Sequence, residues 1–372
     1  MFLIIIEKFL TMGSEKKLWL VVIILLVEIK VQHCVGNPIV PCLFIFGDSL
    51  SDCGNNNKLP TLARANFLPY GIDFPGGPTG RFTNGKTAID FITEDLGFSH
   101  LMPPYANTSG FDVVEGVNYA SGAGGIRKET GTHAGPDMNL ELQINNHKVI
   151  ISQIAAKLGG PDKAQQHLNK CLYYINIGSN DYINNYFLRN TYSTSRTYTP
   201  EQYAEALVQQ YSQQIRVLHQ TGARKFSING LGLVGCIPQA ITLRGKIGSS
   251  TCVEEDNKAV LIFDDKLRIL VDQLNKDLTD SKFVFVDQAM IKSENYPMLK
   301  GMKGMTNRCC KVNEKTGQCN PLEVPCNNRD LHIFWDSFHP TEAVHKLMAK
   351  SAFYSSITKI TFPMDISSLV KM

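Results

Sequence analysis

The chain carries little net charge, and long apolar segments do not recur along it. The formal charge is only +3, from 37 Lys and Arg against 34 Asp and Glu, so no bulk electrostatic attraction to nucleic acid is expected. The scarcity of long apolar runs excludes a polytopic membrane protein. Charged residues make up 19% of the 372 residues and hydrophobic residues 43%, which excludes a disordered chain and a coiled coil. We therefore expect a globular protein with a sizeable hydrophobic core.

The N-terminus departs from this composition. Two lysines precede an apolar run, Leu18–Val27, which suits the central part of a secretory signal peptide and is too short to span a bilayer. Small residues near Gly36 place the cleavage site approximately there. We therefore expect a signal peptide over residues 1–36 and a secreted, extracellular protein with no stable membrane span in its mature form. The alternative is an uncleaved anchor. A single N-glycosylation sequon, at Asn107, is consistent with secretion.

Cysteine usage also favours an oxidising compartment. Removing the leader, which holds Cys34, leaves nine of the ten cysteines, so at least one thiol is unpaired. Cys236 and Cys252 flank a Gly/Ser-rich stretch and could close a loop. Four further cysteines lie close together in a Lys/Asn/Pro-rich segment, and we expect disulfides to staple it as a long loop: Cys309, Cys310, Cys319 and Cys326. A structural zinc site is the alternative for this cluster, although paired C-x2-C spacings are missing.

Short apolar runs rich in β-forming residues alternate with segments of helical periodicity. The expected strands are Cys42–Phe46, Val114–Ala120, Leu172–Ile177, Lys225–Asn229 and Lys282–Val286. One helix is predicted by an apolar stripe from Val260 to Leu278, and another by a capping box at Thr199–Gln202, ending near Gly222. A last helix is expected over residues 341–354.

This alternation of strands and helices predicts the fold class. Strands separated by helices pair in parallel, and the helices then cover both faces of the sheet. We therefore expect an α/β protein, a three-layer α/β/α sandwich with a mostly parallel sheet of about five strands. No linker or repeat divides the chain, so residues 37–372 are expected to form a single domain.

A hydroxyl, a glycine backbone amide and a side-chain carboxamide follow three of the predicted strands, at the sheet edge where open parallel sheets hold their reactive groups. Ser49 lies after the first strand, Gly122 after the second and Asn180 after the third. Near the C-terminus, Asp336 and His339 stand three residues apart. A hydroxyl, an imidazole, a carboxylate and potential oxyanion donors are the groups that acyl transfer requires.

The segments that carry these residues resemble the four sequence blocks of GDSL-type esterase/lipases, which belong to the SGNH hydrolase superfamily. The blocks are Phe46-Gly47-Asp48-Ser49-Leu50, the loop at Gly122, Gly178-Ser179-Asn180-Asp181 and Asp336-Ser337-Phe338-His339-Pro340-Thr341. They occur in family order from residue 44 to residue 341 and are most similar to the secreted plant branch. Cys53 is not expected from that resemblance, which makes it a candidate free thiol.

The resemblance implies a role for each residue. Ser49 is the expected nucleophile, His339 its general base and Asp336 the group that orients the imidazole. The Ser49 N–H, the Gly122 N–H and the Asn180 side-chain amide are the expected oxyanion hole. No metal and no organic cofactor is implied.

Two glycine-rich segments satisfy nucleotide-binding patterns, and we set both aside. Gly80–Thr87 matches the P-loop, but a turn-rich stretch precedes it where a buried strand is needed. Gly230–Gly235 matches the dinucleotide fingerprint, but we expect Pro238 to block the helix that would hold a pyrophosphate. Neither a nucleotide nor a nucleic acid is expected as a partner.

The predicted function is that of a secreted serine esterase or lipase that hydrolyses carboxylic esters through an acyl-enzyme on Ser49. The alternatives are an acyltransferase that uses the same triad and a non-catalytic binding protein on the same scaffold. The sequence leaves the ester substrate open among a long-chain lipid, a cutin-type ester, an acetylated polysaccharide and a small phenolic ester.

Overall fold

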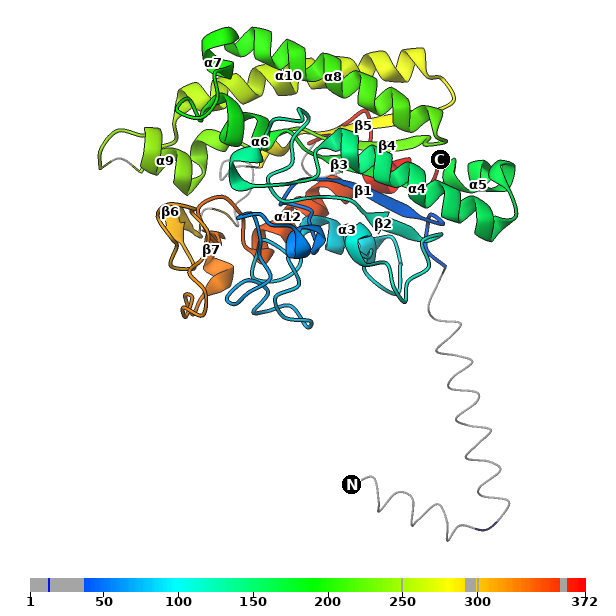
Figure 1. Cartoon of the computed structure of the whole chain (residues 1–372), viewed down its shortest axis with the longest axis horizontal. Coiled ribbons are helices and arrows are strands. Elements are labelled where there is room, and N and C mark those ends of the chain that lie inside the picture. The colour runs from blue at the N-terminus through cyan, green and yellow to red at the C-terminus, as the bar shows by residue number, and fades with distance from the viewer. Residues whose placement is uncertain (1–12, 14–36, 249, 292–298, 300, 355–359) are drawn as a thin grey trace.

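The computed structural model describes residues 13, 37–248, 250–291, 299, 301–354 and 360–372 (Figure 1). The expected signal peptide, over residues 1–36, therefore lies outside the described residues apart from Gly13. Within the described ranges, no helix is both long enough and apolar enough to cross a membrane.

Six strands form the central sheet, in the order β2-β1-β3-β4-β5-β8. They are β2 (Gly116–Asn118), β1 (Leu43–Gly47), β3 (Leu172–Asn176), β4 (Lys225–Asn229), β5 (Lys282–Val286) and β8 (Thr361–Phe362). The first five run parallel, and β8 pairs antiparallel with β5. The predicted α/β class and mostly parallel sheet are confirmed. The predicted strand Val114–Ala120 is shorter than expected, because a turn closed by the Glu115 N–H and the Asp112 carbonyl precedes Gly116.

Helices cover both faces of the sheet (Figure 1). One layer comprises α4 (Leu140–Leu158), α5 (Pro161–Leu168), α8 (Pro200–Gln220) and α10 (Glu254–Asp277), and the other comprises α3 (Ala88–Asp95), α12 (Glu342–Phe353) and α13 (Ile366–Leu369). Successive strand side chains point to opposite layers: Phe44 packs under the first and Ile45 under the second. The runs of consecutive apolar residues in β1 are thus explained by burial on both sides.

Shorter elements lie at the edges of these layers. They are α6 (Ser179–Asp181), α7 (Thr194–Thr197), α9 (Pro238–Arg244), the π-helical turn η4 (Tyr182–Tyr186), and the 3-10 turns η1 (Asn55–Lys58), η2 (Tyr105–Asn107), η3 (Thr132–Ala134), η5 (Val234–Cys236), η6 (Gln288–Met290) and η7 (Arg329–Leu331). A separate parallel pair, β6 (Lys303–Arg308) and β7 (His332–Phe334), was not predicted from the sequence.

The three predicted helices are present, although α10 begins at Glu254, ahead of the stripe that predicted it. Thr199 and Gln202 form a reciprocal capping box in front of α8, since each side chain accepts from the other residue's N–H. The stripe that begins at Val260 is buried along α10. Thr341 precedes the first residue of α12, and Tyr354 follows the last.

Four disulfides pair eight of the nine cysteines that follow residue 36. The pair Cys236–Cys252 closes the loop that the sequence suggested, and the cluster of four pairs as Cys309–Cys326 and Cys310–Cys319. Cys42–Cys171, which joins the starts of β1 and β3, was not anticipated. As predicted, Cys53 is the unpaired thiol among the described residues; it is also buried.

The two glycine-rich segments have structural roles in the described chain. Arg81 of the P-loop-like segment makes a buried, bidentate pair with Asp90, with N–O distances of 2.7 and 2.8 Å, and Thr87 caps α3. The expectation that Pro238 blocks a helix is wrong: proline occupies the first position of α9, where its missing N–H costs nothing. The preceding Gly235 N–H donates to the Asn257 side chain at 2.8 Å, so it is not free for a phosphate.

The P-loop-like segment yields a stability prediction. Arg81→Met leaves the Asp90 carboxylate buried without its cation, and the free energy of unfolding should fall by roughly 3–5 kcal/mol. Lys86→Ala removes the partly exposed ion pair with Glu94 and the contact of the ammonium with the Phe91 ring, and the loss should stay below about 2 kcal/mol. Urea unfolding with the disulfides intact measures both values. Equal losses in the two variants would contradict this interpretation of the segment.

Candidate active site

The strand order places a crevice at the carboxyl ends of β1 and β3. The chain passes from β1 to β2 on one side and then returns to β3 on the other, and such a reversal is where doubly wound sheets bind ligands. Ser49 follows β1, and Asn180 lies in α6 directly after β3. Gly47 allows the two strand ends to meet, because a Cβ there would lie 2.7 Å from the Asn176 carbonyl oxygen.

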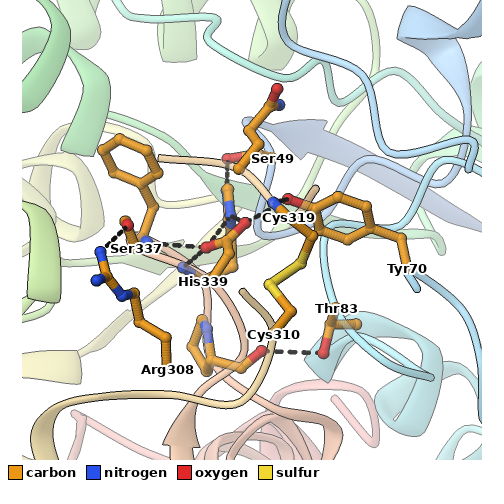
Figure 2. Close-up of polar contacts among 12 residues, drawn as sticks. Ser49, Tyr70, Thr83, Arg308, Cys310, Cys319, Ser337 and His339 are labelled. Atoms are coloured by element: carbon orange, nitrogen blue, oxygen red, sulfur yellow. Dashed lines mark hydrogen bonds and ion pairs between the residues drawn. A yellow bond between two sulfur atoms is a disulfide. The ribbon is translucent and has the colours of Figure 1, made fainter. Parts of the chain in front are cut away.

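A tight turn holds Ser49 at the head of this crevice. The Asp48 N–H donates to the Asn176 carbonyl at 3.2 Å, which ties the turn to β3. The Asp48 side chain accepts from the Leu50 N–H at 2.9 Å, and the Asp48 carbonyl accepts from the Ser51 N–H at 3.1 Å. Ser49 itself remains half-buried, with its hydroxyl directed toward His339 (Figure 2).

The structure brings the three predicted catalytic side chains together. Ser49 Oγ lies 2.8 Å from His339 Nε2, and His339 Nδ1 lies 2.7 and 2.9 Å from the two Asp336 carboxyl oxygens (Figure 2). Asp336 is fully buried and His339 nearly so. Each nitrogen of the imidazole thus has one partner, which is the geometry needed for a base that is oriented on one side and reactive on the other.

A closed turn after β7 positions Asp336 and His339. The Trp335 N–H donates to the His339 carbonyl at 2.8 Å, and the Thr341 N–H donates to the Ile333 carbonyl at 3.0 Å. The Asp336 carboxyl oxygen Oδ1 also accepts from the N–H groups of Phe338 and His339, both at 2.8 Å. The Asp-x-x-His spacing therefore closes on itself locally.

Tyr70 supplies a further donor that sequence reasoning did not identify. Its hydroxyl is fully buried and donates to Asp336 Oδ2 at 2.6 Å, and it accepts from the Cys319 N–H at 3.1 Å (Figure 2). Burial, with the neighbouring Asp336 carboxyl, holds the pKa of Tyr70 well above its ordinary value, so the hydroxyl stays a donor. Because Cys319 is bonded to Cys310, the doubly stapled segment supports the triad through this contact.

The predicted oxyanion donor Gly122 has a different partner. Its N–H donates to the buried Asp52 carboxylate at 3.0 Å, so it is not free for a substrate. Glycine is needed here for close packing instead: a Cβ would lie 2.6 Å from the Phe82 ring, which itself packs against His339 with 5.0 Å between ring centroids. The prediction that the Gly122 N–H belongs to the oxyanion hole is corrected, because that N–H is already paired with Asp52.

The next residue fits the role better. Ala123 lines the cavity beside Ser49 and Asn180, and its φ of +68° is uncommon for a residue other than glycine. Among the described residues, no acceptor is paired with the N–H of Ala123 or of Ser49. The Asn180 side-chain amide donates one hydrogen to the Gly124 carbonyl at 3.0 Å, which leaves its second hydrogen for a ligand.

Buried carboxyl groups hold the loops that carry these donors. Asp52 accepts from the N–H groups of Gly54 and Asn55, besides that of Gly122, and Asp181 accepts from the Ile126 N–H at 2.8 Å. Burial raises the pKa of Asp52 and of Asp181 to about 6 each, and the pKa of Asp48 to about 7. Their backbone hydrogen bonds oppose that rise by stabilising the charged form.

A cavity of about 530 Å³ opens from Ser49 and His339, within the size range of small-molecule sites. Two groups of cysteine and histidine side chains elsewhere in the described chain could suggest a metal: Cys42, His167 and Cys171, and Cys309, Cys326 and His332. In both, the two sulfurs form a disulfide and are not available as thiolate ligands.

Serine hydrolases activate a serine hydroxyl through a histidine that a carboxylate holds in place. The hydrogen bonds from Ser49 through His339 to Asp336 have the geometry that this mechanism requires. Comparison with family models gives the family: residues 43–352 match the model described as GDSL-like Lipase/Acylhydrolase. The chain belongs to this family, and the predicted family and enzyme class are thereby confirmed.

The chain is also similar to plant proteins over nearly its whole length. It is 45% identical to the Arabidopsis thaliana protein GDSL esterase/lipase At1g29670, a match that covers 97% of this chain and 100% of the relative. GDSL esterase/lipase At1g29660, from the same plant, is 42% identical over 98% of this chain and 100% of its own length. GDSL esterase/lipase At4g18970 is 43% identical over 93% and 97%.

Asp48 yields a prediction about pH. Its folded-state pKa, about 7, lies above the ordinary 3.8, so the folded protein keeps a proton that the unfolded chain releases. Stability should therefore fall as pH rises from about 4 to about 7, by roughly 4 kcal/mol from this group. Asp48→Asn keeps the acceptor for Leu50 and removes the titration, so the fall should be smaller. The fall in stability is measured from the melting temperatures of both proteins between pH 4 and pH 8. If the curves of melting temperature against pH run parallel for the variant and the wild type, Asp48 does not cause the fall.

Tyr70 yields a prediction about positioning. Tyr70→Phe deprives Asp336 of one donor and leaves the Cys319 N–H unpaired, which should cost about 1–3 kcal/mol of stability. Because Tyr70 acts through Asp336, kcat should fall with little change in KM, and the acid limb of the pH–rate profile should move. The fall should be smaller than the roughly 10⁴-fold loss seen when a triad carboxylate is removed.

Tyr173→Phe is the matched control. Tyr173 is equally buried, but its hydroxyl has no hydrogen-bond partner in the described part of the chain. Its removal should leave kcat and the pH–rate profile unchanged. If Tyr70→Phe behaves like this control in both measurements, Tyr70 does not position Asp336.

Proposed function

We propose that this chain is a secreted serine esterase that hydrolyses carboxylic esters through an acyl-enzyme on Ser49. The main support for this proposal is the continuous chain of hydrogen bonds from Ser49 Oγ through His339 to Asp336. A serine hydroxyl is a weak nucleophile until an adjacent base accepts its proton, and His339 Nε2 is within reach to do so. Family membership and the names of the relatives support the same chemistry.

In the proposed acylation step, Ser49 Oγ attacks the ester carbonyl carbon while its proton moves to His339 Nε2. The resulting oxyanion would accept hydrogen bonds from the Ser49 N–H, the Ala123 N–H and the Asn180 side chain. Collapse of this intermediate breaks the bond to the alcohol oxygen, which receives the proton from His339. Asp336 stabilises the imidazolium that exists between the two proton transfers.

Deacylation repeats these steps with water as the nucleophile. His339 takes a proton from water, the hydroxide oxygen attacks the acyl carbonyl, and the proton then returns to Ser49 Oγ as the carboxylic acid leaves. Every proton transfer, from Ser49 or water and to the alcohol or Ser49, passes through His339, so the triad suffices for the cycle. The completeness of the constellation favours turnover over a role in binding alone.

Secretion is the second part of the proposal. The apolar leader over residues 1–36 supports it, as do the four disulfides that the fold accommodates. Asn107, the residue expected to carry a glycan, lies at the end of η2 with its side chain exposed, so a glycan would meet no obstacle there.

Replacement of the nucleophile tests the mechanism. Ser49→Ala should lower kcat for p-nitrophenyl esters by more than about 10³-fold. Asn180→Ala, which removes one oxyanion donor, should lower it by about 10²- to 10³-fold. Ser51→Ala is the control, since Ser51 belongs to the same turn but does not contact His339, and should retain activity. Undiminished turnover by Ser49→Ala would exclude the proposed mechanism.

A further inference from the structure

The walls of the active-site cavity are apolar where they meet the catalytic residues. Three short segments build this wall: η4 contributes Ile183, α9 and the residue before it contribute Ala240 and Ile237, and the β7 region contributes Phe334 and Phe338. Ile237, Ala240 and Phe334 are buried and pack as one cluster, with Ile183 and Phe338 against it. The cluster lies beside His339, whose ring is 5.9 Å from that of Phe338.

The apolar wall continues away from the triad along α9. Leu233 and Val234 precede this helix, and Leu243 lies near its end, 60% exposed at the cavity rim. The disulfide Cys236–Cys252 ties the segment before α9 to the segment before α10, so this start of the wall is anchored. When an apolar ligand occupies the cavity, the exposed surface of this leucine is removed from water, which favours binding.

The charged groups of this region do not point to an ionic or a saccharide ligand. Arg244 lines the cavity, but its guanidinium pairs with the buried Asp256 at 2.5 Å and lies 4.9 Å above the Phe187 ring. Glu314 and Lys315 are exposed and come from the disulfide-stapled segment. A sugar would need several converging donors and acceptors, whereas aliphatic side chains form the wall next to the triad.

We propose that this cavity is an acyl-chain pocket, and that the ester substrate carries a medium or long apolar acyl chain. The inference rests on the proposed function, because Ser49 must attack the carbonyl that the chain leads to. The acyl chain would lie along Ile237, Ala240 and Leu243, with its carbonyl at Ser49. An acetyl group would leave this apolar surface uncovered, so acetylated polysaccharides would be poor substrates.

A chain-length series tests the pocket directly. Each methylene buried in an apolar site is worth up to roughly a fourfold gain in kcat/KM. For monomeric p-nitrophenyl esters, kcat/KM should rise from acetate to octanoate by at least about tenfold. If acetate is hydrolysed as well as octanoate, and Ser49→Ala abolishes both activities, ester hydrolysis stands and the acyl pocket is refuted.

Variants locate the pocket. Ala240→Phe fills the wall and should lower the octanoate-to-acetate ratio of kcat/KM by about tenfold or more. Because Ala240 is buried, Leu243→Asp provides a second variant at an exposed position, and its charge should lower the same ratio. Thr242→Phe is the matched control, since Thr242 belongs to the same helix, is exposed and does not line the cavity. An unchanged ratio in both variants would overturn the assignment.

A binding measurement distinguishes the proposed acyl-chain pocket from the proposed catalysis by Ser49. Ser49→Ala protein should bind a fluorescent long-chain fatty acid, and Leu243→Asp in that background should weaken binding by about tenfold or more. Binding without hydrolysis in the wild type would support the pocket while contradicting the proposed catalysis. Hydrolysis without binding would contradict the pocket alone.

Discussion

The burial of the Asp336 carboxyl group is the constraint on which the active site depends. A carboxylate removed from water is stable only when donors surround it, and here they come from its own turn, from the His339 ring and from Tyr70. Tyr70 is 266 residues away in sequence and is held in turn by the Cys319 amide. The need to satisfy one buried group thus joins three distant segments and fixes the direction of the imidazole.

Buried carboxyl groups play the same part on the side of the main sheet. Asp48 shapes the turn that carries Ser49, Asp52 holds the glycine after β2, and Asp181 fixes the backbone that follows the Ala123 loop. Their raised pKa values show that burial acts against their charge while backbone N–H groups stabilise it. The segment around Phe82 connects the two sides, because Thr83 donates to the Pro340 carbonyl at 2.9 Å next to the catalytic histidine.

Sequence reasoning succeeded where a local pattern determines the structure. The strands Lys225–Asn229 and Lys282–Val286 are buried on both faces and appear with the predicted bounds, and the capping box at Thr199 starts α8 as expected. The three predicted catalytic residues came from the family resemblance, and the structure brings two of them together locally because Asp336 and His339 share one closed turn. β8 escaped prediction because two residues carry no periodicity.

What the sequence could not supply depends on contacts between distant residues. Gly122 has the residue type expected of an oxyanion donor, but the missing side chain makes room for the Phe82 ring, and its N–H donates to Asp52. Ala123 was overlooked because nothing in the sequence indicates a positive φ at an alanine. The most direct test of the central claim is covalent trapping with a fluorophosphonate, followed by mass spectrometry of the peptides. We expect one adduct, on Ser49, that is lost in His339→Ala. An adduct on another residue, or none on the folded wild-type protein, would contradict it.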